Sequence, residues 1–288
     1  MFLAYVWRTK NFYSNCMSQA KKTQSAESSF DWSAIFPYIA IPVALVVSAL
    51  LFVNVLGDPA NFEGGDAEKG HPLNVLGTIH KGGFIVPLLI TVNLVVIIFF
   101  VERLISLSKA KGKGNTSKFV RQIRTLLNNG QVDQAIAACD AQRGSVAAVV
   151  KAGLTKYKAV DGDASMDKEA RVTAVKNELD EASALELPML SKNLVILSTC
   201  ASLGVLVGLL GTVRGMITSF EAMATAGAPD ATALSLGISE ALINTFLGIL
   251  GSAIAIILFN FFSTRIDSLT HAIDEAGFSV AQSVGAKK

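Results

Sequence analysis

Four stretches of this chain contain no charged residue, and each is long enough to cross a membrane. They are Ile35–Leu56, Gly83–Val101, Leu194–Val213 and Ala241–Thr264. The hydrocarbon core of a bilayer is about 30 Å thick, which a helix of roughly 20 residues spans. Only 17% of the residues are charged, against about 25% in soluble domains, so little polar sequence remains to cover four such helices. The pattern predicts an all-α polytopic membrane protein with four transmembrane helices and a helical cytoplasmic region.

The distribution of lysine and arginine predicts the orientation of these helices. The tail before the first stretch and the long segment 108–193 are rich in both residue types. The connection 57–82 has only Lys69 and Lys81, and the connection 221–240 has none. Because cytoplasmic loops carry the excess of positive charge, we expect a multi-pass protein of the cell inner membrane with both termini and segment 108–193 in the cytoplasm.

This orientation divides the chain into five parts. They are a mobile cytoplasmic tail (1–31), a first transmembrane hairpin (32–108), a cytoplasmic helical region (109–192), a second transmembrane hairpin (193–266) and a cytoplasmic C-terminal tail (267–288). Apolar spacing and turn residues predict the helices of the cytoplasmic region as Ser117–Leu127, Val132–Cys139, Val146–Leu154 and a long helix from about Asp167 that is kinked at Pro188.

The chemistry-bearing residues favour no enzyme class. The three cysteines and three histidines are far apart and show no metal-ligand spacing. No nucleophile–base arrangement and no GxxxxGK[ST] loop is present in the sequence. A net charge of +2 is too small to suggest a nucleic-acid partner. We therefore expect neither a catalytic site nor a metal or other cofactor.

The third and fourth stretches contain glycines at helical spacing. Gly204, Gly208, Gly211 and Gly215 follow one another at intervals of four, three and four residues, which places them on one face of a helix. Gly248 lies on a face of small residues in the fourth stretch. Faces of small residues allow helix backbones to approach closely in lipid, so we expect these glycines to serve helix packing.

Hydroxyl side chains lie in register with the glycines. Thr212 follows Gly211 in the third stretch, and Thr245 and Ser252 share one face of the fourth. A face of this kind is not expected against lipid. It either packs against other helices, with each hydroxyl bonded back to a carbonyl of its own helix, or it lines a polar path.

Two charged residues flank this polar face. If Thr212 and Thr245 lie at similar depth, Arg214 and Glu240 both fall in the outer half of the membrane, and we predict that they pair. Charged groups at such a depth are costly and are usually paired or functional. No Asp or Glu lies in the middle of any stretch, so if the protein moves protons, the titrating carboxylate comes from another subunit.

Two motifs resemble a known family. The run GLLGTVRGM at 208–216, followed by Phe220, and the run GISEALINT at 237–245, followed by Gly248, are similar to the MotA/TolQ/ExbB proton-channel family, and most like ExbB and TolQ. The resemblance implies a homo-oligomeric ring, generally a pentamer, around a dimer of an ExbD- or TolR-like one-span partner. It also implies that an aspartate of the partner works beside Thr212 and Thr245, and we expect Thr212, Thr245 and Ser252 to line the proton path.

The resemblance implies a role, with alternatives. The leading hypothesis is an ExbB-like subunit of a proton-motive-force-driven motor that energises TonB-dependent outer-membrane transport through a TonB-like protein. A TolQ-like role in envelope integrity with a TolA-like protein, or a gliding or flagellar stator, is the nearest alternative. From other classes, a secondary transporter of small solutes would need inverted repeats, and a scaffold would need no polar stripe. ExbB and TolQ proteins typically have three spans, so Ile35–Leu56 is an addition.

Overall fold

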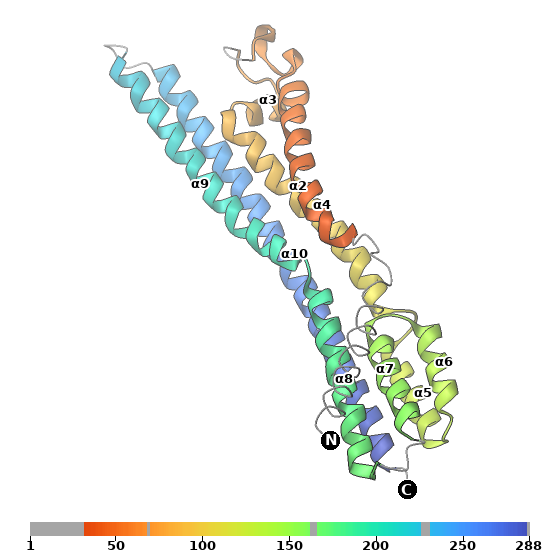
Figure 1. Cartoon of the computed structure of the whole chain (residues 1–288). Helices are drawn as coiled ribbons and strands as arrows, with labels where there is room; N and C mark the ends of the chain where they lie inside the picture. The colour runs from red at the N-terminus through yellow and green to blue at the C-terminus, as the bar shows by residue number, and fades with distance from the viewer. Residues whose placement is uncertain (1–31, 68–69, 162–165, 226–230, 287–288) are drawn as a thin grey trace, which may run out of the picture. The chain divides into compact units, whose positions relative to one another are not determined.

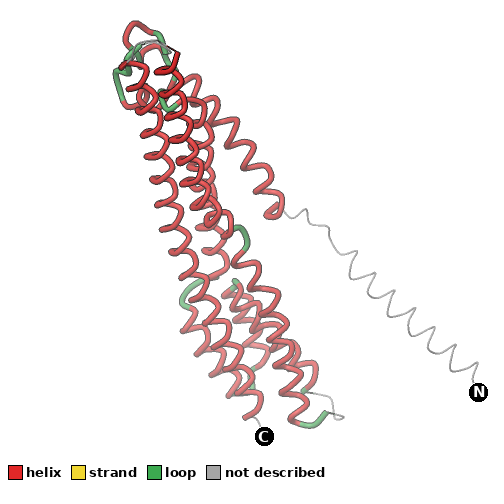
Figure 2. The backbone as a smooth tube through the Cα atoms, turned by 90° about the vertical axis from the view of Figure 1, so that its left-hand side faces the viewer, coloured by secondary structure: helices red, strands yellow, loops and turns green. Residues whose placement is uncertain are grey.

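The computed structural model describes residues 32–67, 70–161, 166–225 and 231–286. Within these ranges the regular structure is helical and contains no β-strand (Figure 2). Four helices are long and apolar enough to cross a membrane. The predicted all-α class with four transmembrane helices is therefore confirmed. The predicted tail at 1–31 lies outside the described residues.

The chain divides into two compact units, Met1–Pro42 and Val43–Lys288. Helix α2 (Trp32–Leu51) begins in the first unit and ends in the second. In the second unit, the buried hydroxyls of Ser48 on α2 and Thr91 on α4 share a hydrogen bond of 2.7 Å. This polar contact fixes the later part of the first span against the second.

A short folded connection joins the first two spans. We call the end of the spans at which this connection lies the loop end. It contains a π-helical turn and several short helices: η1 (Phe52–Leu56), η2 (Pro59–Asn61), η3 (Glu63–Gly65), α3 (Val75–His80) and η4 (Gly83–Ile85). The buried Asn61 side chain donates to the carbonyl oxygen of Val55 at 2.7 Å. The His80 ring stacks on Phe52 at a centroid distance of 4.5 Å. These contacts order the described part of the connection, together with an isolated antiparallel bridge between Phe62 and Pro72.

Helix α4 (Val86–Lys111) continues beyond the second span into the helical region. Arg103 is almost fully buried and is paired with its neighbour Glu102 at 2.6 Å. It also donates to the carbonyl oxygen of Leu190 at 3.3 Å. Because a buried guanidinium needs compensating partners, this contact holds the end of the second span against α8.

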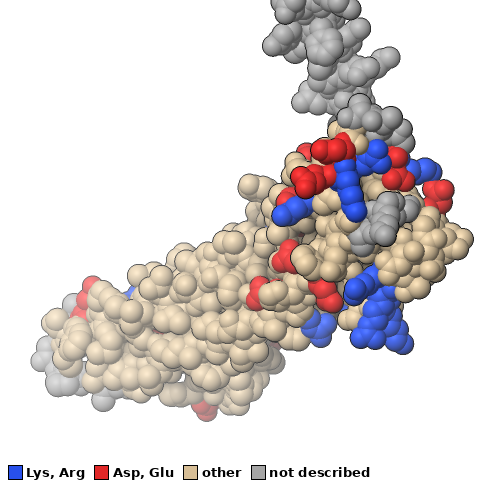
Figure 3. Space-filling model, turned by 90° about the horizontal axis from the view of Figure 1, so that it is seen from below, with Lys and Arg blue, Asp and Glu red and all other residues tan. Residues whose placement is uncertain are grey.

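The helical region is built from four helices, α5 (Thr116–Asn128), α6 (Val132–Gln142), α7 (Ser145–Val160) and α8 (Lys168–Ser191). Helices α5, α6 and α7 each contain one of the predicted helices and extend beyond it, and α8 begins one residue after the predicted start at Asp167. Gly130 and Gly144 take positive φ angles of 75° and 82° in the turns between them, a conformation that favours glycine. Charged side chains gather over this end of the molecule, whereas the flank beyond it is mostly uncharged (Figure 3).

The second hairpin consists of α9 (Leu194–Thr225) and α10 (Ala231–Ala286), which lie side by side (Figure 1). Pro188, where a kink is predicted, lies inside α8, and the helix is interrupted just after it, at Asn193, with a φ of 64°. Helix α10 is continuous through the predicted boundary after residue 266. The segment predicted as a C-terminal tail is therefore mostly helix, and it packs against α5, α7 and α8.

Candidate functional site

A seam of glycines joins α9 to α10. A Cβ atom added at Gly204 would lie 3.0 Å from the carbonyl oxygen of Gly248, and one added at Gly215 would lie 2.6 Å from that of Gly237. A Cβ atom added at Gly208 would lie 3.2 Å from the Cα atom of Gly248. The neighbouring atoms belong to the backbone, so the two helices are in contact at a separation that larger residues would not permit.

Asn244 lies in the middle of this seam and was not singled out in the sequence. Its side chain is fully buried and occupies the space in which Gly211 would carry a Cβ atom. Its amide nitrogen donates to the carbonyl oxygen of Gly82 at 2.8 Å, which ties the loop end of the second span to α10. The sequence signal for Asn244 is its position as a polar residue inside an apolar run, next to Thr245.

The two threonines lie at the edge of the seam. Both are half-buried, and each donates to a carbonyl of its own helix: Thr212 to Leu209 at 2.6 Å and Thr245 to Ala241 at 3.0 Å. Thr245 lies opposite Gly208, which is one helical turn from Thr212, so the hydroxyls are offset by about 6 Å along the membrane normal. Each hydroxyl oxygen keeps acceptor capacity.

Ser252 occupies a different environment from the two threonines. It is almost fully buried between the helices, where its hydroxyl fills the space beside Gly204. Among the described residues its hydroxyl oxygen has no hydrogen-bond partner. Ser252 therefore lies within the seam, whereas Thr212 and Thr245 lie at its edge.

The register of the seam brings Arg214 and Glu240 to the same level. Gly215 lies against Ala241 and Gly237, so the residues next to Gly215 and Ala241 in sequence are neighbours across the two helices. No N···O distance within 4.0 Å joins the two charged groups in the described part of the chain, but they interact electrostatically. Arg214 and Glu240 therefore lie at the level that the predicted pairing requires, and the pairing itself stays a prediction.

The turn before α4 contacts both charged side chains. The Arg214 guanidinium lies 5.6 Å from the centroid of the Phe84 ring. The Glu240 carboxylate lies against Gly83, where an added Cβ atom would be 2.6 Å from Oε1. Gly83 has a φ of 75°, so the close approach and the backbone conformation both favour glycine. The loop end of the site therefore comprises three spans.

The other faces of α9 and α10 are apolar and exposed. Leu206, Leu210, Phe246 and Ile257 all have more than half of their surface accessible. Such faces require lipid or further helices to cover them. No group of three or more potential metal ligands occurs among the described residues, and neither span of the hairpin has a carboxylate in its middle.

Comparison with known proteins agrees with this arrangement. Residues 141–275 match the MotA/TolQ/ExbB proton channel family. The Tol-Pal system protein TolQ of Pseudomonas aeruginosa is 32% identical over 121 residues, which cover 42% of this chain and 52% of that protein. The biopolymer transport protein ExbB of Helicobacter pylori is 38% identical over 91 residues, covering 32% of this chain and 62% of that protein. The biopolymer transport protein ExbB of Pseudomonas putida is 29% identical over 114 residues, which cover 40% of this chain and 35% of that protein.

The matched region contains the site. It includes the interrupted helix pair α8–α9, the glycine seam and both motifs. The chain spans about half the length of the curated relatives it matches. Residues 141–275 are thus similar to the MotA/TolQ/ExbB proton channel family, with likeness to TolQ and ExbB proteins, and the resemblance of the two motifs is confirmed.

Proposed function

We propose that the chain is an ExbB-like subunit of a proton-motive-force-driven inner-membrane motor. In this proposal it surrounds an ExbD-like one-span partner, conducts protons with it and energises TonB-dependent outer-membrane transport. The observation that carries the proposal is the placement of Thr212 and Thr245 at the edge of the glycine seam. Two half-buried hydroxyls there give the hairpin a polar stripe beside its apolar faces.

The proposed mechanism divides the work between two chains. The spans of the second hairpin carry hydroxyls but no mid-span carboxylate, and a proton relay in a membrane needs a titratable group. The partner supplies that carboxyl group. In its protonated form the group donates to the hydroxyl oxygen of Thr212 or Thr245, and in its charged form it accepts from a hydroxyl that rotates away from the carbonyl of its own helix. The hydrogen bonds compensate part of the cost of burying the charged form.

A TolQ-like role is the second candidate. It is favoured by the similarity to the Tol-Pal system protein TolQ of Pseudomonas aeruginosa. Both roles use the same hairpin chemistry and differ in the protein that receives the work. Deletion of the gene separates them, because loss of siderophore-type uptake with an intact envelope supports the first role, whereas detergent sensitivity with normal uptake supports the second.

Proton flux into liposomes tests the proposal directly. The vesicles contain the full chain together with its one-span partner, and a pH-sensitive dye reports flux under an imposed potential. We expect Thr212→Val and Thr245→Val each to lower the flux roughly tenfold, because one hydrogen bond to a charged group in the path contributes about 1.5 kcal/mol.

Thr199→Val is the matched control. Thr199 lies on α9 and donates to Val195 of its own helix at 2.8 Å, but it is exposed. Flux in this variant should equal that of the unchanged chain. Equal flux from vesicles that lack the partner would contradict the motor proposal and indicate a transporter.

A further inference from the structure

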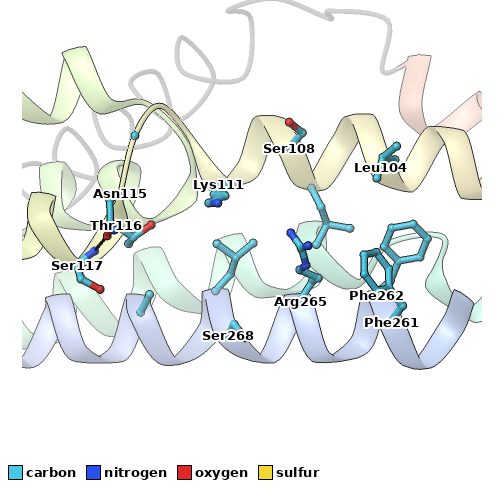
Figure 4. A pocket seen from close by; sticks show the side chains of 14 residues that line it. Leu104, Ser108, Lys111, Asn115, Thr116, Ser117, Phe261, Phe262, Arg265 and Ser268 are labelled. Carbon is cyan, nitrogen blue, oxygen red and sulfur yellow. Dashed lines mark hydrogen bonds between the residues drawn. The ribbon is translucent and has the colours of Figure 1, made fainter. Parts of the chain in front are cut away.

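A cavity of about 600 Å³ lies between α4 and α10 where both helices leave the membrane, on the side of the helical region (Figure 4). Arg265 on its wall is the first charged residue after the fourth span, Ala241–Thr264. Lys111 on the opposite wall ends α4. At Arg265 the cavity is therefore at the depth of a lipid headgroup layer, which adds roughly 5–8 Å to each side of the hydrocarbon core. Its other end extends beyond that layer, because Lys111 follows the end of the second span at Val101 by roughly 15 Å of helix.

The lining changes from apolar to polar along the cavity. Leu104, Phe261 and Phe262 line the end near the spans, whereas Lys111 and Asn115 lie toward the other end (Figure 4). Leu104 and Phe261 are exposed rather than packed in the core. A ligand that fits both ends has an apolar part toward the membrane and a polar part away from it.

The charge of the lining has one sign. Among the described residues that line the cavity, Lys111 and Arg265 are the only charged ones. Neither forms a salt bridge with another described residue, and Arg265 lies 5.0 Å over the ring of its neighbour Phe261. Their long apolar stems allow the charged ends to reach into a headgroup layer. The ligand therefore carries negative charge.

The start of α5 closes the polar end. Asn115 accepts from the backbone amides of Ser117 and Lys118, so these amides are already satisfied and do not bind an anion. The remaining side-chain donors include the two cations and the hydroxyls of Ser108, Thr116, Ser117 and Ser268. Recognition by two cations with flanking hydroxyls suits a phosphate group.

We propose that this cavity binds an anionic phospholipid of the adjacent leaflet. Lys111 and Arg265 hold the phosphate, and the acyl chains lie along Leu104 and Phe261. The amphipathic lining and the uncompensated positive charge at headgroup depth together select such a lipid over a zwitterionic one. The proposal does not depend on proton conduction. A bound lipid would join α4 to α10 at the point where the spans meet the helical region.

Quenching of a tryptophan in the cavity by brominated lipids tests this proposal. The reporter is Leu104→Trp in a full chain that also carries Trp7→Phe and Trp32→Phe. It is reconstituted in phosphatidylcholine vesicles that contain increasing mole fractions of brominated phosphatidylglycerol or, separately, of brominated phosphatidylcholine. We expect half-maximal quenching by the anionic lipid at a roughly thirtyfold lower mole fraction, because each of the two cations contributes about 1 kcal/mol.

Variants of the charged residues test which side chains cause the preference for the anionic lipid. Lys111→Gln with Arg265→Gln should make the two lipids equivalent, while Lys111→Arg with Arg265→Lys should keep the preference. The matched control is Lys109→Gln with Lys113→Gln, which removes two nearby charges that do not line the cavity and should leave the preference unchanged. Circular dichroism of each variant verifies that the helices are intact.

Three results would overturn the proposal. They are equal quenching by both lipids in the unchanged cavity, a preference that survives Lys111→Gln with Arg265→Gln, and weak quenching by either lipid, which would mean that protein covers the cavity. Inorganic phosphate at 10 mM should not reduce the quenching, whereas displacement by phosphate alone would indicate a site for a free anion.

Discussion

At the scale of single residues, the charged side chains of Arg214 and Glu240 at the loop end of the second hairpin are understood as a pair. The glycine seam brings Arg214 and Glu240 to one level, and the turn at Gly83–Phe84 contacts both. An uncompensated charge near the edge of a bilayer is costly. We therefore predict that each of the two groups makes the presence of the other less unfavourable.

Neutralising one of these charges is predicted to cost more than neutralising both. Glu240→Gln should lower the free energy of unfolding by about 1 kcal/mol, and adding Arg214→Gln should restore it, because the coupling between close charges is of that order. Thermal melting of the four proteins of this cycle in detergent measures the coupling. Glu275→Gln, an exposed charge on the same helix, is the control, and additive effects of the two changes would contradict the pairing.

Cys139 is a buried thiol in α6 whose reactivity reports on the helical region. Burial, with a smaller contribution from Asp140, raises its pKa to about 12. In a Cys16→Ala, Cys200→Ala background, we predict slow labelling by iodoacetamide at pH 8.5 in the folded protein and fast labelling in urea, since the thiolate is the nucleophile.

The same shift gives a pH dependence with a defined sign. The folded state keeps the Cys139 proton more tightly than the unfolded state, so the stability from the neutral thiol is present below the ordinary value of 9.0. It is lost as the pH rises from about 9 toward 12. Urea unfolding of the unchanged protein and of Cys139→Ala over this range measures the effect, and parallel pH profiles would contradict it.

At the scale of elements, the contact between α9 and α10 determines where every site residue lies. The glycines allow the backbones to meet, and that contact fixes which residue of α10 faces each residue of α9. Asn244, bonded to Gly82, then joins the second span to the pair. The site therefore depends on close packing rather than on a particular chemical group.

A single methyl group in the seam is predicted to separate the helices. In Gly248→Ala, the new Cβ atom would lie 2.5 Å from the carbonyl oxygen of Gly204, and overpacking of this kind costs roughly 1–3 kcal/mol. Gly277→Ala is the matched control on the same helix, because nothing lies within 4 Å of its added Cβ atom. Melting temperatures compare the two variants, and an equal effect of both would contradict the role of the seam.

At the scale of the whole molecule, the apolar surface exceeds what one chain covers. Exposed leucines, isoleucines and phenylalanines follow both α9 and α10. Lipid can cover one side of the hairpin, but the side with Thr212 and Thr245 presents hydroxyls that are poorly suited to lipid. In the proposed arrangement, copies of the same chain around a partner would cover that side.

The oligomer is predicted to contain five copies of the 30.4 kDa chain. Mass photometry or native mass spectrometry of the detergent-solubilised protein measures the copy number. Gly248→Ala should reduce the fraction of the assembled form, because a displaced hairpin changes the surface that neighbouring copies contact. A monodisperse monomer of the unchanged chain would contradict the ring.

Much of the fold of this protein follows from the sequence alone. Apolar runs of about 20 residues specify membrane helices, because backbone groups in lipid must be satisfied within a helix. The spacing of Gly204, Gly208, Gly211 and Gly215 depends only on helical periodicity, which is a local property. The helices of the region 109–192 followed from apolar spacing and from turn residues such as Gly130. The sequence by itself therefore determined the class, the spans and the face of α9 that packs.

Only the tertiary structure decided what lies opposite that face. The burial of Asn244 against Gly211, the place of Ser252 within the seam and the contacts of Gly83 and Phe84 with the two charges depend on the register between helices. The continuation of α10 to Ala286 also depends on packing against α5, α7 and α8. Periodicity defines a helix face, but the partner of a face is set by contacts between residues far apart in the chain.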